Sequence, residues 1–220
     1  MKKQFLVIGL GQFGGSITEH LIAQGHEVLA IDKDEHKVNE FMDIATQVIK
    51  ADATDEQVLK NIGAHNFYKV VVAIGNDMEA SILTTLALKD LGVKHVMVKA
   101  VNESHRKVLQ KIGADEVINP ERDMGKRAAS HLISHNIIEY LELSSEHSLI
   151  EMVAAPQMHG STIGELNIRA KYGCNIIAIK SQDNRFNISP KPEDEIRPGD
   201  VLVIVGSNRE IQSLEKALFK

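Results

Sequence analysis

Residues 5–15 read Phe-Leu-Val-Ile-Gly-Leu-Gly-Gln-Phe-Gly-Gly, so that a G-x-G-x-x-G element, Gly9, Gly11 and Gly14, follows directly on an apolar strand. Gly9 allows a tight turn, Gly11 lets the backbone approach a pyrophosphate, and Gly14 lets the following helix pack closely on the strand. The helix that begins near Phe13 directs unpaired backbone amides and the positive end of its dipole at the turn. This stretch predicts a strand, turn and helix that bind an anion.

The next segment gives the glycine element its context. A second apolar strand, residues 27–31, ends at Asp32, eighteen residues after Gly14. A carboxylate at the tip of the second strand can accept hydrogen bonds from both hydroxyls of an adenosine ribose, and it repels a 2′-phosphate. The sequence therefore predicts a nucleotide site that disfavours NADP. The alternative is a structural glycine turn followed by an Asp that caps a helix.

Apolar segments of strand length alternate with helical segments over the first part of the chain. Thr54 and Gln57 form a capping box that predicts a helix through Ile62, and residues 77–91 carry apolar side chains at helical spacing. This alternation predicts an α/β fold with a Rossmann-like, doubly wound and mainly parallel sheet. Its six strands are expected at residues 5–8, 28–31, 48–51, 70–74, 96–98 and 117–118.

The carboxyl ends of these strands share one edge of the sheet, where such folds bind ligands. At this edge Asp52 could accept a hydrogen bond from an adenine amino group, with Ala53 small enough for the ring to lie flat. Alternatively, Asp52 and Thr54 cap the next helix. Lys99 could meet a phosphate or simply end its strand in solvent. The candidate nucleotide-binding residues at the strand ends are Gly9, Leu10, Gly11, Gln12, Phe13, Gly14, Asp32, Lys33, Asp52, Ala53, Thr54, Ile74, Gly75, Asn76 and Lys99.

Glu121 follows Pro120 in the first turn of a predicted helix. An acidic residue in this position usually complements the helix dipole. Beside a bound nucleotide the same carboxylate could share a divalent cation with the phosphates, because hard cations prefer oxygen ligands. The residues themselves leave both interpretations open.

The chain changes character after the first domain, which we place at residues 1–134. Residues 135–148 are predicted to be a linker, and a second domain is expected over residues 149–220. This second domain mixes short strands and helices, which predicts a small α+β fold. It is too small to carry the usual substrate site of a dehydrogenase.

Two capping boxes mark helices in the second domain. Thr162 and Glu165 predict a short helix through Ala170, and Ser207 and Glu210 predict the start of a final helix.

Composition excludes several classes of protein. The net charge is −5 and aromatic residues make up only 4% of the 220 residues, so the sources of phosphate neutralisation and base stacking that nucleic-acid binding needs are missing. The apolar stretches are of strand length and no signal peptide is predicted. The single cysteine, Cys174, suits the cytoplasm. We therefore expect any link to a membrane to run through a protein partner.

Several stretches together carry a resemblance to a known family. They read Val-Ile-Gly-Leu-Gly-Gln-Phe-Gly-Gly at 7–15, Lys-Ala-Asp-Ala-Thr-Asp at 50–55, Val-Ala-Ile-Gly at 72–75 and Asn-Pro-Glu-Arg-Asp-Met-Gly at 119–125. With the small second domain, they make the chain resemble RCK proteins (also called KTN, regulators of potassium conductance) over essentially its whole length, and among them the cytosolic subunits of Ktr-type potassium transporters. The resemblance implies a homo-oligomer, with dimers assembled into an octameric ring, on the cytoplasmic face of a potassium-translocating membrane subunit.

The same resemblance implies which ligands and residues form the first site. Gly9, Gly11 and Gly14 would cradle the phosphates of ATP or ADP, or those of NAD or NADH. Asp32 would hold the ribose, and Asp52 with Ala53 would meet the adenine. The pocket would be lined further by Gly75, Asn76, Lys99 and His105. The counterpart of Glu121 in relatives lies near the phosphates at a dimer interface and helps to bind a cation, which implies Mg²⁺ or another cation here.

Gln12 departs from the family pattern. Relatives often have an arginine in this position, which reaches a γ-phosphate across the dimer. Because Gln12 is uncharged and lacks the bidentate fork of arginine, strong discrimination of ATP over ADP is in doubt.

The resemblance also implies a second ligand. In Ktr relatives from Gram-positive bacteria the small domain binds cyclic di-AMP between two copies, and a two-fold ligand suits a two-fold interface. Arg169 would meet a phosphate, Asn175 would hydrogen-bond the base, and apolar walls would come from Ile163, Ile168, Ile176 and Ile177. The alternative is that Arg169 is a solvated helix-end cation and that the isoleucines belong to the core.

These observations favour a non-enzymatic ligand switch, in which a bound nucleotide changes the shape of a ring and thereby the flux through a membrane partner. The alternative is a small NAD-dependent oxidoreductase. That activity needs a proton-transfer residue beside the nicotinamide, and we find no residue arranged for it.

Overall fold

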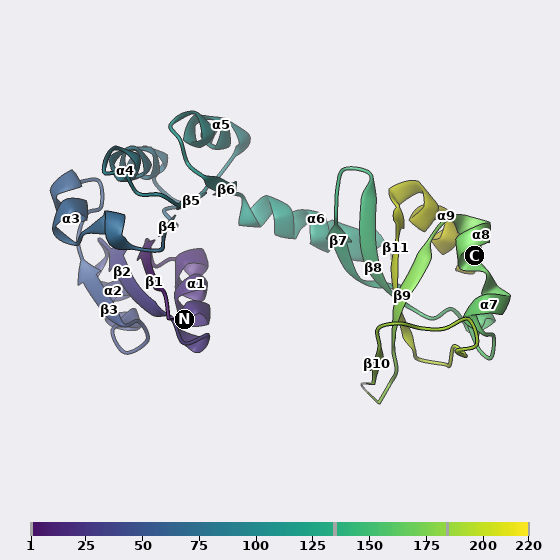
Figure 1. Ribbon diagram of the computed structural model, residues 1–220. Coiled ribbons are helices and arrows are strands. Elements are labelled where there is room, and N and C mark those ends of the chain that lie inside the picture. Colours follow the sequence, from purple (N-terminus) through teal and green to yellow (C-terminus); the bar gives the residue numbers. More distant parts are fainter. Residues whose placement is uncertain (1, 134–135, 184, 220) are drawn as a thin grey trace. The chain divides into compact units, whose positions relative to one another are not determined.

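The computed structural model describes residues 2–133, 136–183 and 185–219. Two compact units are present, Met1–Asp123 and Met124–Lys220, and both are labelled by element in Figure 1. Residues 134 and 135, where the predicted first domain ends and the predicted linker begins, lie outside the described residues. Each unit is considered by itself.

The first unit is built on a six-stranded parallel sheet with the strand order β3-β2-β1-β4-β5-β6. Backbone pairing places Ile8, at the end of β1, beside Ile31 of β2 and Val72 of β4. The order reverses direction at β1, which creates the switch point where doubly wound folds bind ligands. The predicted α/β class is confirmed. The strands are β1 (Gln4–Ile8), β2 (Glu27–Asp32), β3 (Gln47–Lys50), β4 (Lys69–Val72), β5 (Val96–Lys99) and β6 (Glu116–Ile118).

Helices connect these strands and cover both faces of the sheet. Side chains of β1 alternate between two apolar clusters, with Leu6 and Ile8 in one and Phe5 and Val7 in the other. Burial on both faces explains why the strand is a continuous apolar run and not an alternating one. The helices are α1 (Gln12–Ala23), α2 (Glu35–Phe41), α3 (Glu56–Asn61), η1 (Ala64–Asn66), α4 (Met78–Asp90) and α5 (Glu103–Lys111). A further helix, α6 (Pro120–Ile133), follows β6 and includes the boundary between the two units.

Side chains at the strand-to-helix connections cap five of these helices, and at α6 the Asn119 Oδ1 accepts from the Arg122 amide. Asp34, Asp55, Asp77 and Asn102 each accept a hydrogen bond from a backbone amide in the first turn of α2, α3, α4 and α5. The predicted capping box of Thr54 with Gln57 is wrong. Because α3 begins one residue later than that box requires, Asp55 accepts from the Gln57 amide, while the Thr54 hydroxyl donates to Asp52.

The second unit contains a five-stranded sheet in the order β10-β9-β11-β8-β7, with every neighbouring pair antiparallel. The predicted small α+β fold is confirmed. Its elements are β7 (Ile137–Glu142), β8 (His147–Val153), η2 (Pro156–Met158), α7 (Ile163–Leu166), α8 (Ile168–Tyr172), β9 (Asn175–Lys180), β10 (Phe186–Asn187), β11 (Val201–Ser207) and α9 (Asn208–Leu218).

The stretch 135–148, predicted as a linker, contains strand β7. This strand pairs with β8, and its Ile137 side chain is buried in the core of the second unit. Glu139 and Glu142 are both exposed, and a register shift between Ile137 and Glu139 interrupts the alternation that would mark a strand in the sequence. The sheet of the second unit therefore begins before Leu149.

Both predicted capping boxes of the second unit are confirmed, at Thr162 with Glu165 and at Ser207 with Glu210. The single helix predicted through Ala170 is instead two, α7 and α8. They are separated at Asn167, whose φ of 48° is left-handed. Asn tolerates this conformation better than most residues, so it can end one helix and precede the next.

Candidate functional site

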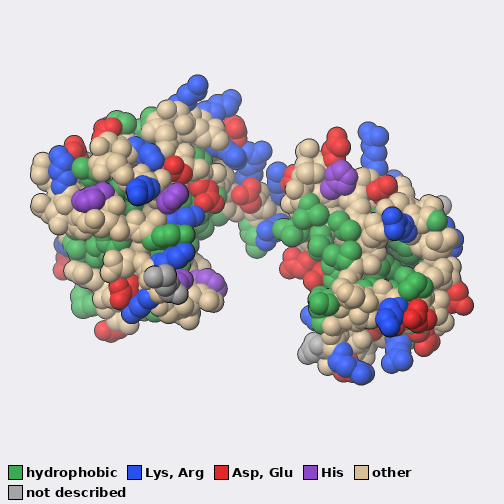
Figure 2. Space-filling model, in the orientation of Figure 1, with side chains coloured by type: hydrophobic (Ala, Val, Ile, Leu, Met, Phe, Trp, Pro, Cys, Tyr) green, Lys and Arg blue, Asp and Glu red, His purple; other side chains and the backbone are tan. Residues whose placement is uncertain are grey.

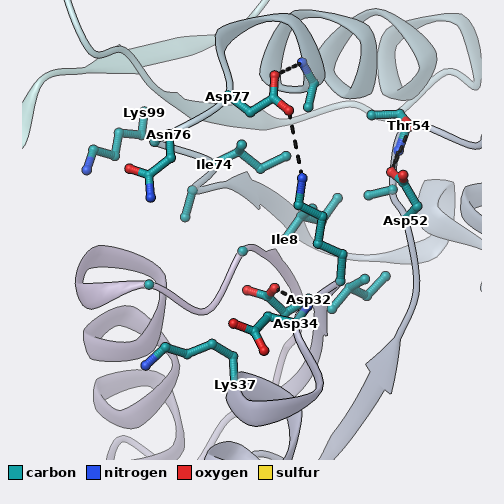
Figure 3. A pocket seen from close by; sticks show the side chains of 18 of the residues that line it. Ile8, Asp32, Asp34, Lys37, Asp52, Thr54, Ile74, Asn76, Asp77 and Lys99 are labelled. Carbon is teal, nitrogen blue, oxygen red and sulfur yellow. Dashed lines mark hydrogen bonds and ion pairs between the residues drawn. The ribbon is translucent and has the colours of Figure 1, made fainter.

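A cavity of about 760 Å³ opens at the carboxyl edge of the six-stranded sheet. Figure 3 shows side chains from the ends of β1, β2 and β4 and from the segments that follow them converging on it. The structure brings most of the predicted residues together here. Those that line the cavity are Gly9, Gly11, Gln12, Phe13, Asp32, Lys33, Asp52, Ala53, Thr54, Ile74, Gly75, Asn76, Lys99 and Glu121.

Each of the three glycines has a different structural role. Gly9 has a φ of +96°, which side-chain-bearing residues rarely adopt. A methyl group on Gly14 would overlap the carbonyl oxygen of Gly9 and would lie 2.9 Å from the Ala73 Cβ, so the approach of α1 to the sheet requires glycine. A methyl group on Gly11 would meet no protein atom within 4 Å and would point into open space. Gly14 itself does not line the cavity.

The amino terminus of α1 offers hydrogen-bond donors to the cavity. Its N-cap is Gly11, which has no side chain to accept from the first turn, and that turn contains no acidic residue. The amides at a helix start have no intrahelical acceptor, and the dipole adds partial positive charge there. This end of α1 is therefore suited to an anion.

Asp32 is held in place by two backbone amides. One carboxylate oxygen accepts from the Leu10 amide at 2.6 Å, and the other accepts from the Asp34 amide at 2.9 Å. Leu10 itself is buried and does not line the cavity, but its amide fixes the carboxylate to the glycine turn. Each oxygen keeps further acceptor capacity, so Asp32 can still receive hydroxyl groups of a ligand.

Asp52 forms a local turn with Thr54 and does not cap the helix. One carboxylate oxygen, Oδ1, accepts both from the Thr54 amide at 3.0 Å and from the Thr54 hydroxyl at 2.7 Å. These hydrogen bonds hold the pKa of Asp52 below its usual range. The carboxylate is thus ionised and fixed at the cavity wall, where it can accept hydrogen bonds, while Asp55 does the capping.

Lys99 and Glu121 form an ion pair at the side of the cavity. The Lys99 Nζ lies 2.5 Å from the Glu121 Oε1, and it also lies 6.0 Å above the centre of the Phe13 ring. The Lys99 side chain is only 13% exposed, whereas the Glu121 side chain is 65% exposed. The hydrogen bond from Lys99 lowers the pKa of Glu121. A half-buried cation and an accessible carboxylate therefore lie next to each other at the site.

Several lining residues were not predicted. One of them, Asp77, lies 3.8 Å from the predicted residue Lys33, and its other carboxylate oxygen caps α4. Other lining residues that were not predicted include Asp34, Lys37, Glu79, Ala80 and Leu83. Asp34 and Asp77 could have been found as capping residues directly after a strand end, whereas no sequence signal marks Leu83.

His105 is buried inside the first unit and is not among the residues that line the cavity. Its side chain is fully buried, the Val101 amide donates to its Nδ1 at 3.4 Å, and its Nε2 has no partner among the described residues. The resemblance implied that His105 lines the pocket, whereas in this structure its side chain is enclosed by protein. The burial lowers the pKa of His105.

We expect the free energy of unfolding to decrease as the pH falls below about 6.5, the usual pKa of a histidine in an unfolded chain. Because the folded-state pKa of His105 is lowered, the unfolded state binds the proton first, so stability is present above that pH and is lost as the pH falls through the folded pKa. Thermal unfolding of the wild type and of His105→Phe between pH 7.5 and 5 measures this. Equal pH slopes in the two proteins would show that His105 is not responsible.

The candidate residues of the second unit fall into two groups. Ile168 is 4% exposed and belongs to the core, with Ile163 and Ile176 packed partly buried against it. Arg169 on α8 is exposed, Asn175 at the start of β9 is half-buried, and Ile177 is exposed. The second group could contact a ligand directly, whereas Ile168 can only support the surface from beneath.

The cavity offers groups of both charges to a ligand. Acidic side chains, lysines and backbone amides are arranged around it. Within the described ranges, no group of three or more His, Cys, Asp and Glu side chains is placed to hold a metal ion. In that same part of the chain, no helix has the length and apolarity needed to cross a membrane.

Comparison with known proteins gives two family matches and close relatives. Residues 5–120 match the TrkA-N domain and residues 149–218 match the TrkA-C domain. The chain is 53% identical to the Ktr system potassium uptake protein C of Bacillus subtilis (strain 168) over 216 residues, 98% of this chain and 97% of that protein. It is 49% identical to the Ktr system potassium uptake protein A of the same organism over 213 residues, 97% of this chain and 96% of that protein.

A solved structure matches over both units. The GsuK channel bound to NAD has a TM-score of 0.54 and 25% sequence identity, covering 99% of this chain and 38% of that one.

Proposed function

Because this chain belongs to the family of TrkA-N and TrkA-C domain proteins, the RCK proteins, and lies close to the Ktr system potassium uptake proteins, we propose that it is the nucleotide-gated regulatory subunit of a potassium uptake transporter. The family is one of non-enzymatic regulatory subunits. A potassium-translocating membrane protein is the proposed partner, and the chain is proposed to act at the cytoplasmic face of the membrane through it.

The cavity at the carboxyl edge of the first sheet carries this proposal. Three features surround one space: the start of α1, which no side chain caps, the half-buried Lys99 cation and the fixed Asp32 carboxylate. A nucleotide offers phosphates to the first two and ribose hydroxyls to the third. ATP, ADP and NAD(H) all carry phosphates and ribose hydroxyls. The GsuK channel bound to NAD, which has a similar fold, supports NAD(H) as a ligand.

The Glu121 carboxylate is the proposed ligand of a cation at this site. We propose that the Lys99 ammonium group moves from Glu121 to the phosphates of the nucleotide, because the phosphates carry more negative charge than one carboxylate. The Glu121 carboxylate, which is ionised and 65% exposed, would then share Mg²⁺ or another cation with the phosphates. Nucleotide and cation would thus bind with positive coupling.

Gln12 lines the cavity at the first position of α1. Its amide can donate a hydrogen bond to a phosphate but contributes no charge, and charge-assisted hydrogen bonds are roughly twice as strong as neutral ones. We therefore expect only modest discrimination between ATP and ADP at this site.

The signal from the nucleotide is proposed to pass through an interface between copies. Leu83 of α4 lines the cavity and is 45% exposed, and Leu86, on the same face of α4, is 41% exposed. An apolar helix face next to the ligand suits contact with a second copy, so that a ligand which moves α4 also changes that contact. Dimers formed in this way would assemble into the octameric ring proposed for the family, and only differential affinity for two ring states can drive the change.

Cyclic di-AMP is the proposed ligand of the second unit. Arg169, Asn175 and Ile177 reach its surface, and they offer a cation for a phosphate, an amide for a base and an apolar contact. Ile163 and Ile176 line the same region half-buried, while Ile168 supports it from the core.

Calorimetric titration of the full chain with ATP, ADP, NADH and cyclic di-AMP tests the proposal. We expect saturable binding of at least one adenine nucleotide with less than about tenfold preference for ATP over ADP, since a neutral hydrogen bond contributes roughly 0.5–1.5 kcal/mol. Cyclic di-AMP is expected to bind independently. No heat and no thermal shift with any of the four ligands would contradict the proposal.

The matched variant for this experiment is Arg169→Ala. It removes the cation that is proposed to meet a phosphate of cyclic di-AMP, so it should lose the cyclic di-AMP signal and keep nucleotide binding. Incubation of NADH with simple carbonyl substrates distinguishes the remaining alternative, because an oxidoreductase would consume NADH and a regulatory subunit would not.

A further inference from the structure

His105 is an ionisable side chain enclosed in the first unit, and it is not among the residues that line the nucleotide cavity. It is 0% exposed, as is Leu109, which lies one turn later in α5. Figure 2 shows other histidine side chains at the surface of the first unit. A charged ring is costly to bury away from water, so the enclosed ring of His105 is uncharged in the folded protein at neutral pH.

The hydrogen bond to His105 fixes which ring nitrogen carries the proton. The Val101 amide donates to Nδ1 at 3.4 Å, and a backbone N–H group can only donate. Nδ1 must therefore accept, so the single proton of the neutral ring lies on Nε2. A protonated ring carries an N–H group at both nitrogens and cannot accept from Val101. This hydrogen bond thus exists only while His105 is neutral.

The hydrogen bond closes the connection between β5 and α5. His105 is the third residue of α5, and its own amide donates at 2.8 Å to the side chain of Asn102, which caps the helix. Val101 lies two residues after Lys99, the last residue of β5. The ring and the cap therefore hold the start of α5 against the end of the strand that carries Lys99.

An ion pair links the start of α5 to the other member of the Lys99–Glu121 pair. Arg122 donates to the carboxylate of Glu103, the first residue of α5, at 2.8 Å. Arg122 follows Glu121 directly in the first turn of α6. The start of α5 is thus joined to Lys99 along the backbone and to Glu121 through Arg122. A shift of this turn must disturb the cation and the carboxylate at the side of the cavity.

The surroundings of His105 do not compensate a charge on its ring. Helix α4 and strand β6 pack against α5, and the buried side chains of α4 are Ser81, Thr84, Thr85 and Leu88, none of which is ionisable. Burial is the cause that lowers the pKa of His105, and the positive end of the α5 dipole also disfavours a cation there. The charged side chains of α4, β5, α5, β6 and the start of α6 are all at least partly exposed: Glu79, Lys89, Asp90, Lys99, Glu103, Arg106, Lys107, Lys111, Glu116, Glu121 and Arg122.

We propose that neutral His105 is a positioning residue for the nucleotide site and that its protonation weakens nucleotide binding. The neutral ring holds the start of α5, and through it Lys99 and Glu121, in the arrangement that meets the phosphates. Protonation breaks the hydrogen bond from Val101 and drives the ring toward water, which releases that arrangement. The inference rests on the proposed nucleotide site and adds the proton as a second input to it. By linkage, the nucleotide and the proton on His105 oppose each other's binding.

The loss of affinity is expected on the acid side of neutrality. An unperturbed histidine has a pKa of about 6.5, and the pKa of His105 in the folded protein is lowered from that value. The ring is therefore neutral at pH 7.5, and affinity is lost as the pH falls through the lowered pKa. We expect the dissociation constant of the wild type to rise at least about five-fold between pH 7.5 and pH 5, the lower end of the range for coupled sites.

Calorimetric titration of the full chain with ADP and with NAD⁺ at the two pH values tests this. His105→Gln keeps an oxygen that can accept from the Val101 amide but does not titrate, so it should bind as the wild type does at pH 7.5 and retain that affinity at pH 5. His105→Phe removes the acceptor, so its affinity should be lowered at both pH values. Dividing the pH ratio of the wild type by that of His105→Gln removes the ionisation of the ligand's own phosphates.

His36→Gln is the matched control. His36 lies on α2, is exposed and does not line the cavity, so the same substitution there should keep the pH ratio of the wild type. Thermal unfolding at both pH values checks that each variant is folded at the temperature of the titration.

Two results would overturn the inference while leaving the nucleotide site in place. A wild-type dissociation constant that is the same at pH 7.5 and pH 5 would do so without any variant. Equal pH ratios in the wild type and in His105→Gln would assign the pH dependence to another group. If neither ADP nor NAD⁺ bound at pH 7.5, the proposed nucleotide site would itself be wrong, and this inference with it.

Discussion

Gly14→Ala is expected to abolish nucleotide binding and to lower the free energy of unfolding by about 1–3 kcal/mol, the range typical of overpacked sites. The added methyl group would overlap the carbonyl oxygen of Gly9 and crowd the Ala73 side chain. Neither is the end of a flexible side chain, so α1 itself must move away from β1. The amides at the start of α1 would then no longer converge with Lys99 and Asp32 on one ligand.

Gly11→Ala is the matched control, because it adds the same methyl group one turn earlier. Its backbone is extended, with a φ of −69°, and no protein atom lies within 4 Å of the new carbon. We expect a loss of stability below about 1 kcal/mol, since alanine is only a poorer N-cap than glycine. The methyl group projects toward the ligand space, however, so the affinity for nucleotide should fall about tenfold or more.

Thermal unfolding and calorimetric titration of the two variants separate close packing from ligand contact. Gly14→Ala should lose both stability and binding, whereas Gly11→Ala should lose binding only. If Gly11→Ala bound ATP, ADP and NADH as tightly as the wild type, the phosphates would not lie on the glycine turn, and the proposed site would be wrong even with the fold intact.

The parts of this fold that the sequence predicted are those set by local patterns. Buried parallel strands such as β1 and β4 are continuous apolar runs, and the φ of Gly9 and the close packing at Gly14 each demand the residue that is present. Residues at the carboxyl ends of parallel strands must meet at one edge. This is why Asp32 and Asn76, far apart along the chain, were placed in one pocket.

The errors lie where tertiary contacts decide between local alternatives. Thr54 and Asp55 are both capable N-caps, and the start of α3 at Glu56 selects Asp55. Strand β7 contains apolar residues, but a register shift between Ile137 and Glu139 interrupts their alternation, and pairing with β8 fixes the strand. Tertiary contacts also decide the position of His105. The resemblance implied that it lines the pocket, whereas the packing of α5 buries its ring.

Asp32→Ala is expected to lower the affinity for adenine nucleotides roughly 100-fold or more, because it removes a charged acceptor that can receive both ribose hydroxyls, each such hydrogen bond contributing about 1.5–3 kcal/mol. It also removes the acceptor of the Leu10 and Asp34 amides, so some loss of stability should accompany it. Asp55→Ala is the control for that loss. Asp55 caps α3 through the Gln57 amide and does not line the cavity, so its removal should cost about 1 kcal/mol of stability and leave affinity unchanged.

Asp32→Asn distinguishes the charge of this side chain from its shape. Asparagine keeps one acceptor oxygen, so part of the turn and part of the ribose contact should survive, but the negative charge that repels a 2′-phosphate is gone. We therefore expect the ratio of NADPH to NADH affinity to rise in this variant, with NADH binding weakened and NADPH binding less disfavoured than in the wild type. Competition titrations with the two reduced cofactors measure the ratio. An unchanged ratio would mean that the ribose does not contact Asp32. The role of Asp32 would then be limited to accepting hydrogen bonds from the two backbone amides.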